Sequence, residues 1–146
     1  MYADNHKKFV AVLNRKHPAS ILMNALGHMT AGLIACSTDP AKEYNFLDYN
    51  NADAGLQAKI SHYPYIVLTA NNSNQIRTTL AKAAELGLQH NAFVTAMLGQ
   101  SAQQQIKQTR DAKPDELDYV ALVLFGDADR IDALTRRFSL YKNNGS

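Results

Sequence analysis

The sequence lacks the features that mark disulfide-rich, collagen-like, low-complexity and membrane-spanning proteins. Its 146 residues include one cysteine, Cys36, so neither an internal disulfide nor a cysteine-clustered metal site can form. Glycine occurs 7 times and proline 4 times, too rarely for a collagen-like or low-complexity chain. No run of apolar residues approaches the roughly 18 that a membrane span needs. These absences indicate a globular chain, and we expect no membrane partner.

Neither sign of charge is in large excess, because the chain has 15 basic and 13 acidic residues and a net charge of +2. This balance neither requires nor excludes a nucleic-acid partner, since such a partner depends on cations gathered on one face. The first eight residues are polar and lack the apolar core of a secretory signal. We therefore expect a cytoplasmic protein, which also suits the single cysteine.

The common signatures of cofactor and catalytic sites are absent. The chain contains no G-x-G-x-x-G, no P-loop and no G-x-S-x-G, so dinucleotide binding, Walker-type phosphate binding and α/β-hydrolase chemistry lose their usual motifs. His6, His17, His62 and His90 have no histidine four residues away and no carboxylate at ligand spacing. We expect neither a metal ion nor a cofactor.

Enough apolar sequence is present, 46% of the residues, to bury one sizeable core, and residues 1–146 are expected to form a single domain. Short apolar runs alternate with stretches of helical periodicity, which indicates an α/β fold. The runs predict strands at 9–13, 65–70, 91–98 and 119–125, the last at the centre of the sheet, with 45–49 as an optional edge strand. The periodic stretches predict helices from about 19 to 36, at 73–86, at 101–109 and after 126.

The first predicted helix has the clearest apolar stripe, one face of a 3.6-residue period. The stripe consists of Leu22, Ala25, Leu26, Met29, Leu33 and Cys36. Gly27 and Gly32 lower the helix propensity, so we expect their small size to permit close backbone packing. Cys36 has no basic neighbour to activate it, and packing is its expected role.

Ligands of open α/β sheets bind beyond the carboxyl ends of strands, so polar residues there are the first candidates. Lys16 follows the first strand and precedes a helix start, a combination that can hold a phosphate. Gln100 and Ser101 follow the fourth strand and can hydrogen-bond a neutral ligand. Asn24 and His28 share a side of the first helix apart from its main stripe, and His28 is a candidate general base. A purely structural role is the alternative for each of these residues.

The order of motifs resembles one known group of proteins. In chain order the motifs are FVAVL, ILMNALGHMTAGL, YIVLTANN, AAELGL and YVALVLFGDADRIDALTRRFSLYK. They resemble the type II peptidyl-tRNA hydrolase superfamily, closest to its uncharacterised bacterial branch, a domain family of unknown function, over about residues 7–142. The resemblance implies a three-layer α/β/α sandwich around a mixed four-stranded sheet.

Hydrolases of that superfamily carry a lysine at the entry to the first helix, and the resemblance places Ile21 at that position, with Lys16 earlier in the loop. They also have an aspartate before a Gly-x-Thr-Gln turn, where this chain has AMLGQS, Ala96 to Ser101, and no acid. Without the lysine and the acid, peptidyl-tRNA hydrolysis is not expected. Whether the protein is an enzyme stays open, and no catalytic residue is assigned.

We favour a protein that is not a hydrolase and that binds a small molecule or a protein partner in the cleft between the first helix and the Gly99 loop. A divergent hydrolase using Lys16 or His28 is one alternative. A tRNA-binding module without catalysis is another, less favoured, and it would need several cations on one face: Arg15, Lys16, Arg136, Arg137 and Lys142. Dimers are common among domains of this kind, and we expect a homodimer.

Overall fold

A computed structural model describes residues 6–99 and 101–142 of the chain. The strands are β1 (Lys7–Asn14), β2 (Phe46–Asn51), β3 (Leu56–Ser61), β4 (Tyr65–Ala70), β5 (Gln89–Val94), β6 (Tyr119–Asp127) and β7 (Ser139–Leu140). The helices are α1 (Ala19–Ala35), α2 (Pro40–Tyr44), α3 (Ser73–Glu85), α4 (Ala102–Asp111) and α5 (Ala128–Thr135), and the 3-10 turns are η1 (Thr95–Met97) and η2 (Pro114–Glu116). The expected α/β class is confirmed.

The main sheet is mixed and has five strands in the order β5-β6-β1-β4-β7. Strands β1 and β4 are parallel, whereas β6 runs antiparallel to both of its neighbours and β7 runs antiparallel to β4. The four-stranded sheet that the resemblance implied is therefore wrong by one strand, because the two-residue β7 adds an edge. The centre of the sheet is β1, and not β6 as the apolar run at 119–125 suggested; β6 is the interior strand beside it.

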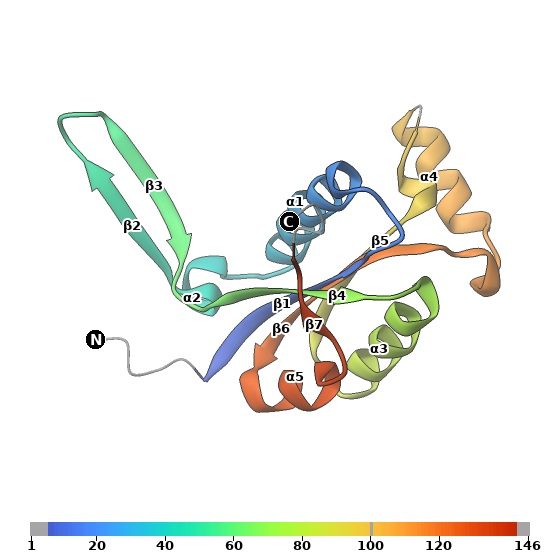
Figure 1. Ribbon diagram of the computed structural model, residues 1–146. Helices are drawn as coiled ribbons and strands as arrows, with labels where there is room; N and C mark the ends of the chain where they lie inside the picture. Colours follow the sequence, from blue (N-terminus) through green and yellow to red (C-terminus); the bar gives the residue numbers. More distant parts are fainter. Residues whose placement is uncertain (1–5, 100, 143–146) are drawn as a thin grey trace.

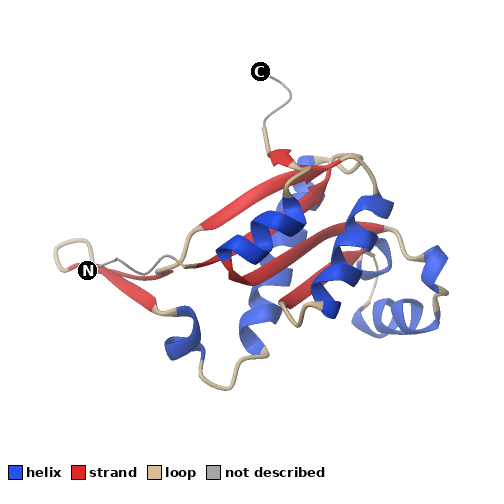
Figure 2. Ribbon diagram, turned by 90° about the horizontal axis from the view of Figure 1, so that it is seen from below, coloured by secondary structure: helices blue, strands red, loops and turns tan. Residues whose placement is uncertain are grey.

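Helices cover both faces of this sheet, as Figures 1 and 2 show. On one face α1 packs on side chains that include Phe9, Ala11 and Val123. On the opposite face α3 and α5 pack on the alternate residues of the same strands, among them Val10 and Val12. Because successive side chains of a strand point to opposite faces, a continuous apolar run such as FVAVL supplies both cores.

The predicted apolar stripe of α1 is confirmed for its central residues, but the prediction is wrong for Cys36 at the C-terminal end of the stripe. Leu22, Ala25, Met29 and Leu33 are buried, while Leu26 is half-buried at the border of the same core. Cys36 is exposed, which corrects the packing role expected for it. The helix ends at Ala35, so residue 36 follows the last regular turn and its side chain faces away from the sheet core.

The optional strand at 45–49 exists, but it is not an edge of the main sheet. As β2 it pairs with β3 in a separate two-stranded hairpin, which Figure 1 shows projecting away from the body of the molecule. The helix predicted after residue 126 is α5, which ends at Thr135; Phe138 lies beyond it, packed beside the core under α3 and α5. Within the described residues, no helix is long and apolar enough to cross a bilayer.

Candidate functional site

A cleft lies beside edge strand β5, between the middle of α1 and the turn η1 that follows β5. Its volume is about 620 Å³. The residues that line it come from α1, β5, η1 and the start of α4, and they are Asn24, His28, Met29, Asn91, Ala92, Phe93, Met97, Leu98, Gly99, Ala102 and Gln105. We call this hollow the α1–β5 cleft. It is the cleft between the first helix and the Gly99 loop that the sequence suggested.

The chemistry of the α1–β5 cleft is that of an uncharged site. Among the described residues, its lining contains no aspartate, glutamate, lysine or arginine. Met29 and Phe93 are buried and supply apolar surface, while Asn24, Asn91 and Gln105 supply amide groups that both donate and accept hydrogen bonds. Such a surface suits a neutral ligand with both apolar and polar parts.

Asn91 is fixed in place by its own hydrogen bonds. Its Nδ2 donates to the backbone oxygen of Met29 at 3.0 Å, and its Oδ1 accepts from the backbone N–H of Ala92 at 2.9 Å. A β-carbon at Gly32 would come within 2.8 Å of the same Nδ2, so Gly32 is closely packed, but against a side chain and not against backbone as expected. At Gly27 nothing lies within 4 Å of that position, and the expectation was wrong there.

Asn24 and His28 stand one helical turn apart on α1, and both are exposed at the rim of the cleft. Within the part of the chain that the structure describes, neither side chain has a hydrogen bond or an ion pair. Gln105 donates from Nε2 to the backbone oxygen of Gly99 at 3.1 Å, which leaves its Oε1 open to a ligand. The structure therefore brings Asn24 and His28 together as groups that are available for binding.

The other three candidates are not in this lining. Ser101 is exposed and caps α4, where its Oγ accepts from the backbone N–H of Gln104 at 3.2 Å. The cap explains the residue without a ligand, and the binding role of Ser101 stays a prediction. Gln100 lies outside the described residues. Lys16 lines a different hollow, at the carboxyl end of β1.

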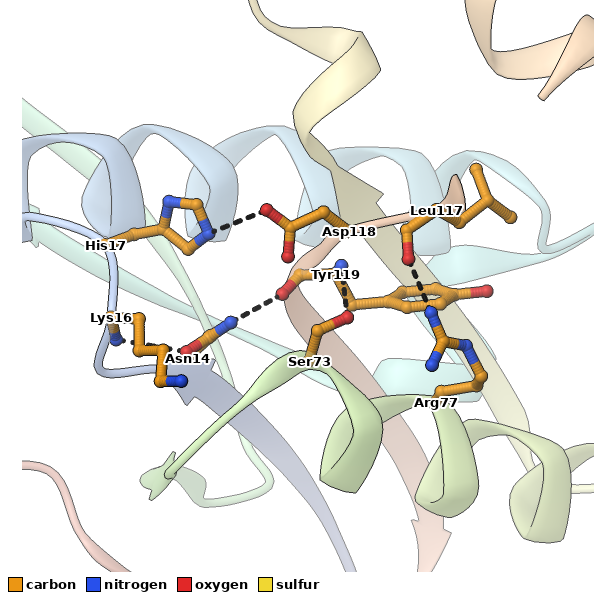
Figure 3. A network of polar contacts seen from close by, with 8 residues as sticks. All are labelled: Asn14, Lys16, His17, Ser73, Arg77, Leu117, Asp118 and Tyr119. Atoms are coloured by element: carbon orange, nitrogen blue, oxygen red, sulfur yellow. Dashed lines mark hydrogen bonds and ion pairs between the residues drawn. The ribbon is translucent and has the colours of Figure 1, made fainter. Parts of the chain in front are cut away.

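This second hollow has a volume of about 540 Å³. Its polar side chains form hydrogen bonds with backbone atoms of neighbouring elements (Figure 3). Asn14 Nδ2 donates to the backbone oxygen of Tyr119 at 2.9 Å, and Ser73 Oγ accepts from the N–H of Tyr119 at 2.8 Å. Arg77 Nη2 donates to the oxygen of Leu117 at 2.6 Å. These three side chains fasten the start of β6 to the end of β1 and the start of α3.

The expected phosphate role of Lys16 gains little from this setting. Its backbone N–H donates to Asn14 Oδ1 at 3.0 Å, and the hollow that it lines also contains Asp115, Glu116 and Asp118. These three carboxylates outnumber the two cations of the lining, Lys16 and Arg77, so the hollow does not favour an anion. His17 Nε2 is 3.6 Å from a carboxylate oxygen of Asp118, on the same side. The sequence missed Arg77, because only the packing of α3 against β6 brings the oxygen of Leu117 near it.

The resolved shifts of pKa lie outside both hollows. Burial raises the pKa of Tyr44 to about 12, and the nearby Glu43 and Cys36 add to that effect. Burial also raises the pKa of Tyr65, partly offset by its hydrogen bond with the Thr30 hydroxyl at 2.6 Å. Neither tyrosine lines the α1–β5 cleft or the second hollow.

Comparison with known proteins places residues 7–142 under a family model described as "Protein of unknown function (DUF2000)". A solved structure of a protein of unknown function from Agrobacterium tumefaciens strain C58 is similar, with a TM-score of 0.75 and 18% sequence identity. The similarity covers 94% of this chain and 98% of that one. At this identity it shows a shared fold and no more. No protein with a curated description matches the chain.

Proposed function

The chain belongs to the DUF2000 family of proteins of unknown function, and we propose that it binds a small uncharged molecule in the α1–β5 cleft. One observation carries this proposal: the described lining combines buried apolar side chains with three side-chain amides and one imidazole, and it contains no charged residue. The proposal is one of binding, without an assigned reaction.

The size and the polarity of the cleft support such a ligand. A volume of about 620 Å³ lies within the usual range for sites that take small molecules. A charged ligand would lose hydration on entry and would meet no opposite charge in the described lining, which is costly. A neutral molecule with amide-like or heterocyclic groups avoids this cost because Asn24, His28 and Gln105 can replace its bonds to water.

The expected pose of the ligand follows from which side chains of the cleft already have hydrogen-bond partners. Asn91 uses one donor and one acceptor in hydrogen bonds to backbone atoms. Its side chain is therefore held in place and forms a fixed wall of the cleft. Asn24, His28 and the Oε1 of Gln105 supply hydrogen bonds that adapt to the ligand. The apolar part of the ligand would rest on Met29 and Phe93. Binding energy would come from this apolar contact, and selectivity from the amides.

A thermal-shift screen tests the proposal, with neutral nucleosides and amides in one set and nucleotides and carboxylates in the other. A ligand that binds only the folded protein raises stability by about 2.7 kcal/mol at a hundredfold excess over its Kd. We expect the neutral molecules to stabilise the protein. Asn24→Ala or His28→Ala is expected to raise the Kd of such a ligand about tenfold. Lys16→Ala, in the other hollow, is the matched control and leaves the Kd unchanged. Stabilisation by anions alone, lost in Lys16→Ala, would refute the proposal.

The type II peptidyl-tRNA hydrolase-like relationship, the three-layer sandwich and a cytoplasmic location belong to this proposal as well. The three-layer sandwich is supported by the packing of α1 on one face of the mixed sheet and of α3 and α5 on the other. Ile21 is half-buried beside the core under α1, so it offers no cation to replace the lysine of the hydrolases.

A further inference from the structure

A third hollow lies against α4, next to the α1–β5 cleft. Its volume is about 530 Å³. The described residues that line it are Leu98, Gly99, Gln104, Gln105, Lys107, Gln108 and Asp111. Three of them, Leu98, Gly99 and Gln105, also line the α1–β5 cleft, so the two spaces adjoin each other. We call this third space the α4 hollow.

Gly99 and Gln105 stand where the two spaces meet. Gly99 has no side chain to divide them, and beyond its chain neighbours nothing lies within 4 Å of a β-carbon built on it. Its φ of 116° is a conformation that favours glycine. The side chain of Gln105 is held against the backbone at this boundary, because its Nε2 donates to the Gly99 oxygen at 3.1 Å. A ligand in the cleft can therefore continue past Gly99 into the α4 hollow.

One polar face of α4 lines the α4 hollow. Four of its residues recur at i, i+3, i+4 and i+7, the spacing of one side of a helix, and they are Gln104, Lys107, Gln108 and Asp111. Lys107 Nζ and Asp111 Oδ2 form an ion pair at 3.1 Å, so their charges offset each other. The described lining of the α4 hollow therefore has no net charge, and it continues the uncharged character of the α1–β5 cleft.

Gln104 and Gln108 are one helical turn apart and available to a ligand. Both are exposed, and within the described chain neither side chain has a hydrogen bond or an ion pair. Each amide presents a donor and an acceptor side by side. Two neighbouring hydroxyl groups of a sugar complement such a pair, because every hydroxyl both donates and accepts. A peptide is less suited, since it pairs best with the open backbone of a strand, whereas α4 bonds its backbone within the helix.

We propose that the ligand of the α1–β5 cleft is a neutral glycoside, whose uncharged head lies in the cleft and whose sugar passes Gly99 and binds Gln104 and Gln108 in the α4 hollow. This inference rests on the proposed function and extends it by naming the class of ligand. The sugar exchanges hydrogen bonds with water for hydrogen bonds with the two amides. A carboxylate or phosphate in its place would meet the Lys107–Asp111 pair, which repels an anion as much as it attracts one.

Isothermal titration calorimetry with three related compounds tests this proposal. The compound p-methoxybenzamide carries an uncharged head alone. Its β-glucoside, in which glucose replaces the methyl group, adds a neutral sugar, and the corresponding glucuronide adds a carboxylate to that sugar. We expect the glucoside to bind about tenfold more tightly than p-methoxybenzamide, because it gains hydrogen bonds to two amides. The glucuronide is expected to bind more weakly than the glucoside.

Variants of α4 locate the sugar. Gln104→Ala and Gln108→Ala are each expected to raise the Kd of the glucoside about fivefold, the effect of one lost hydrogen bond, and to leave the Kd of p-methoxybenzamide unchanged. Gln103→Ala is the matched control, because it removes the same amide from the same helix and Gln103 lines neither space. Asn24→Ala, in the cleft, is expected to raise the Kd of both compounds. The three glutamines are exposed, and circular dichroism checks that each variant is folded.

The outcomes separate this inference from the proposed function. A glucoside that binds no more tightly than p-methoxybenzamide would overturn the inference and leave the proposed function standing. So would a gain that survives both Gln104→Ala and Gln108→Ala, or a glucuronide that binds more tightly than the glucoside. A glucoside whose Kd depends on Gln104 and Gln108 but not on Asn24 would support the α4 hollow and contradict binding in the cleft. Failure of all three compounds to bind would contradict both.

Discussion

The amide nitrogen of Asn91 lies 2.8 Å from the place that a β-carbon on Gly32 would occupy, so edge strand β5 meets helix α1 where residue 32 has no side chain. This contact lets Asn91 reach the backbone oxygen of Met29 and fixes one wall of the α1–β5 cleft. The glycine and the asparagine are separated along the chain, and only the packing of α1 on β5 joins them.

Gly32→Ala and Gly27→Ala form a matched pair on the same helix. Replacing a helical glycine by alanine gains about 1 kcal/mol from propensity alone, and Gly27 has open space for the new methyl group. At Gly32 the methyl group displaces Asn91 and breaks its bond to Met29, which costs about 1 kcal/mol or more. Urea unfolding is expected to show Gly27→Ala as the more stable variant by about 1–2 kcal/mol. Equal stabilisation by both changes would contradict the contact.

Leu22→Ala and Leu26→Ala test the stripe of α1. Leu22 is 1% exposed, and its truncation is expected to cost about 2–5 kcal/mol by leaving a cavity. Leu26 is half-buried at the border of the core, so its truncation is expected to cost clearly less. Chemical denaturation of the two variants gives the comparison. A larger loss for Leu26 would mean that α1 is rotated relative to the sheet.

Local chemistry explains why some elements were predictable. Asn72 caps α3 with its Oδ1 on the N–H of Gln75 at 2.9 Å, and Gln75 reaches back to the N–H of Asn71 at 2.8 Å. Gly87 adopts the left-handed conformation, at φ 69°, that ends this helix. These signals lie within a few residues and need no tertiary partner. The sequence therefore predicted α3 to within one residue at its C-terminal end.

Other elements depend on partners far along the chain. Strand β3 alternates Leu56, Ala58 and Ile60 with polar residues, which is a strand signal, but no strand was predicted there. Strand β7 has two residues, too few for any period. In the candidate site, Asn24 and His28 follow from helical spacing, whereas Asn91 and Gln105 enter the cleft only because β5 and α4 pack near α1.

Tyr44 makes stability depend on pH in alkaline solution. Its pKa is raised to about 12 in the folded protein, against 10.0 for an ordinary tyrosine, mainly by burial. Between these values the unfolded chain has lost the proton and the folded one has kept it, so the free energy of unfolding falls as pH rises from about 10 towards 12. Below about pH 10 this contribution is fully present.

Tyr44→Phe removes that titration and leaves the rest of the chain to titrate as before. The variant is expected to be less stable near neutral pH, because the phenolic O–H no longer donates to Gln89 Oε1 across 2.7 Å. Above about pH 10 its stability is expected to fall less steeply than that of the wild type. Urea unfolding at a series of alkaline pH values measures both slopes, and identical slopes would show that Tyr44 ionises as freely as in the unfolded chain.

Peptidyl-tRNA is expected to survive incubation with the protein. The described lining of the α1–β5 cleft has no carboxylate or ammonium group, and His28 has no described partner to orient it. Release of peptide from labelled peptidyl-tRNA is the measurement. Turnover that disappears in Lys16→Ala or His28→Ala would reinstate the divergent hydrolase.

RNA binding is expected to be weak, about 10⁻⁴–10⁻⁶ M at physiological salt by analogy with nonspecific DNA binding. Lys16 shares its hollow with three carboxylates, and Arg137 donates to the oxygen of Gln75 at 3.1 Å. A salt titration with tRNA measures the slope, which falls by about one unit for each lost phosphate contact. Submicromolar binding with a slope reduced in Lys16→Ala would favour the tRNA-binding module.

The position of β1 at the centre of the sheet has a consequence for how the chain folds. Its first residues pair with the end of β6, Lys7 with Asp127, near the opposite end of the sequence. A growing chain on the ribosome can form the parallel β1–β4 pair early, but it must wait for β6 to leave the ribosome before both edges of β1 are covered. Such long-range closure slows folding, and until it occurs one edge of the buried strand β1 is open to aggregation or to chaperones.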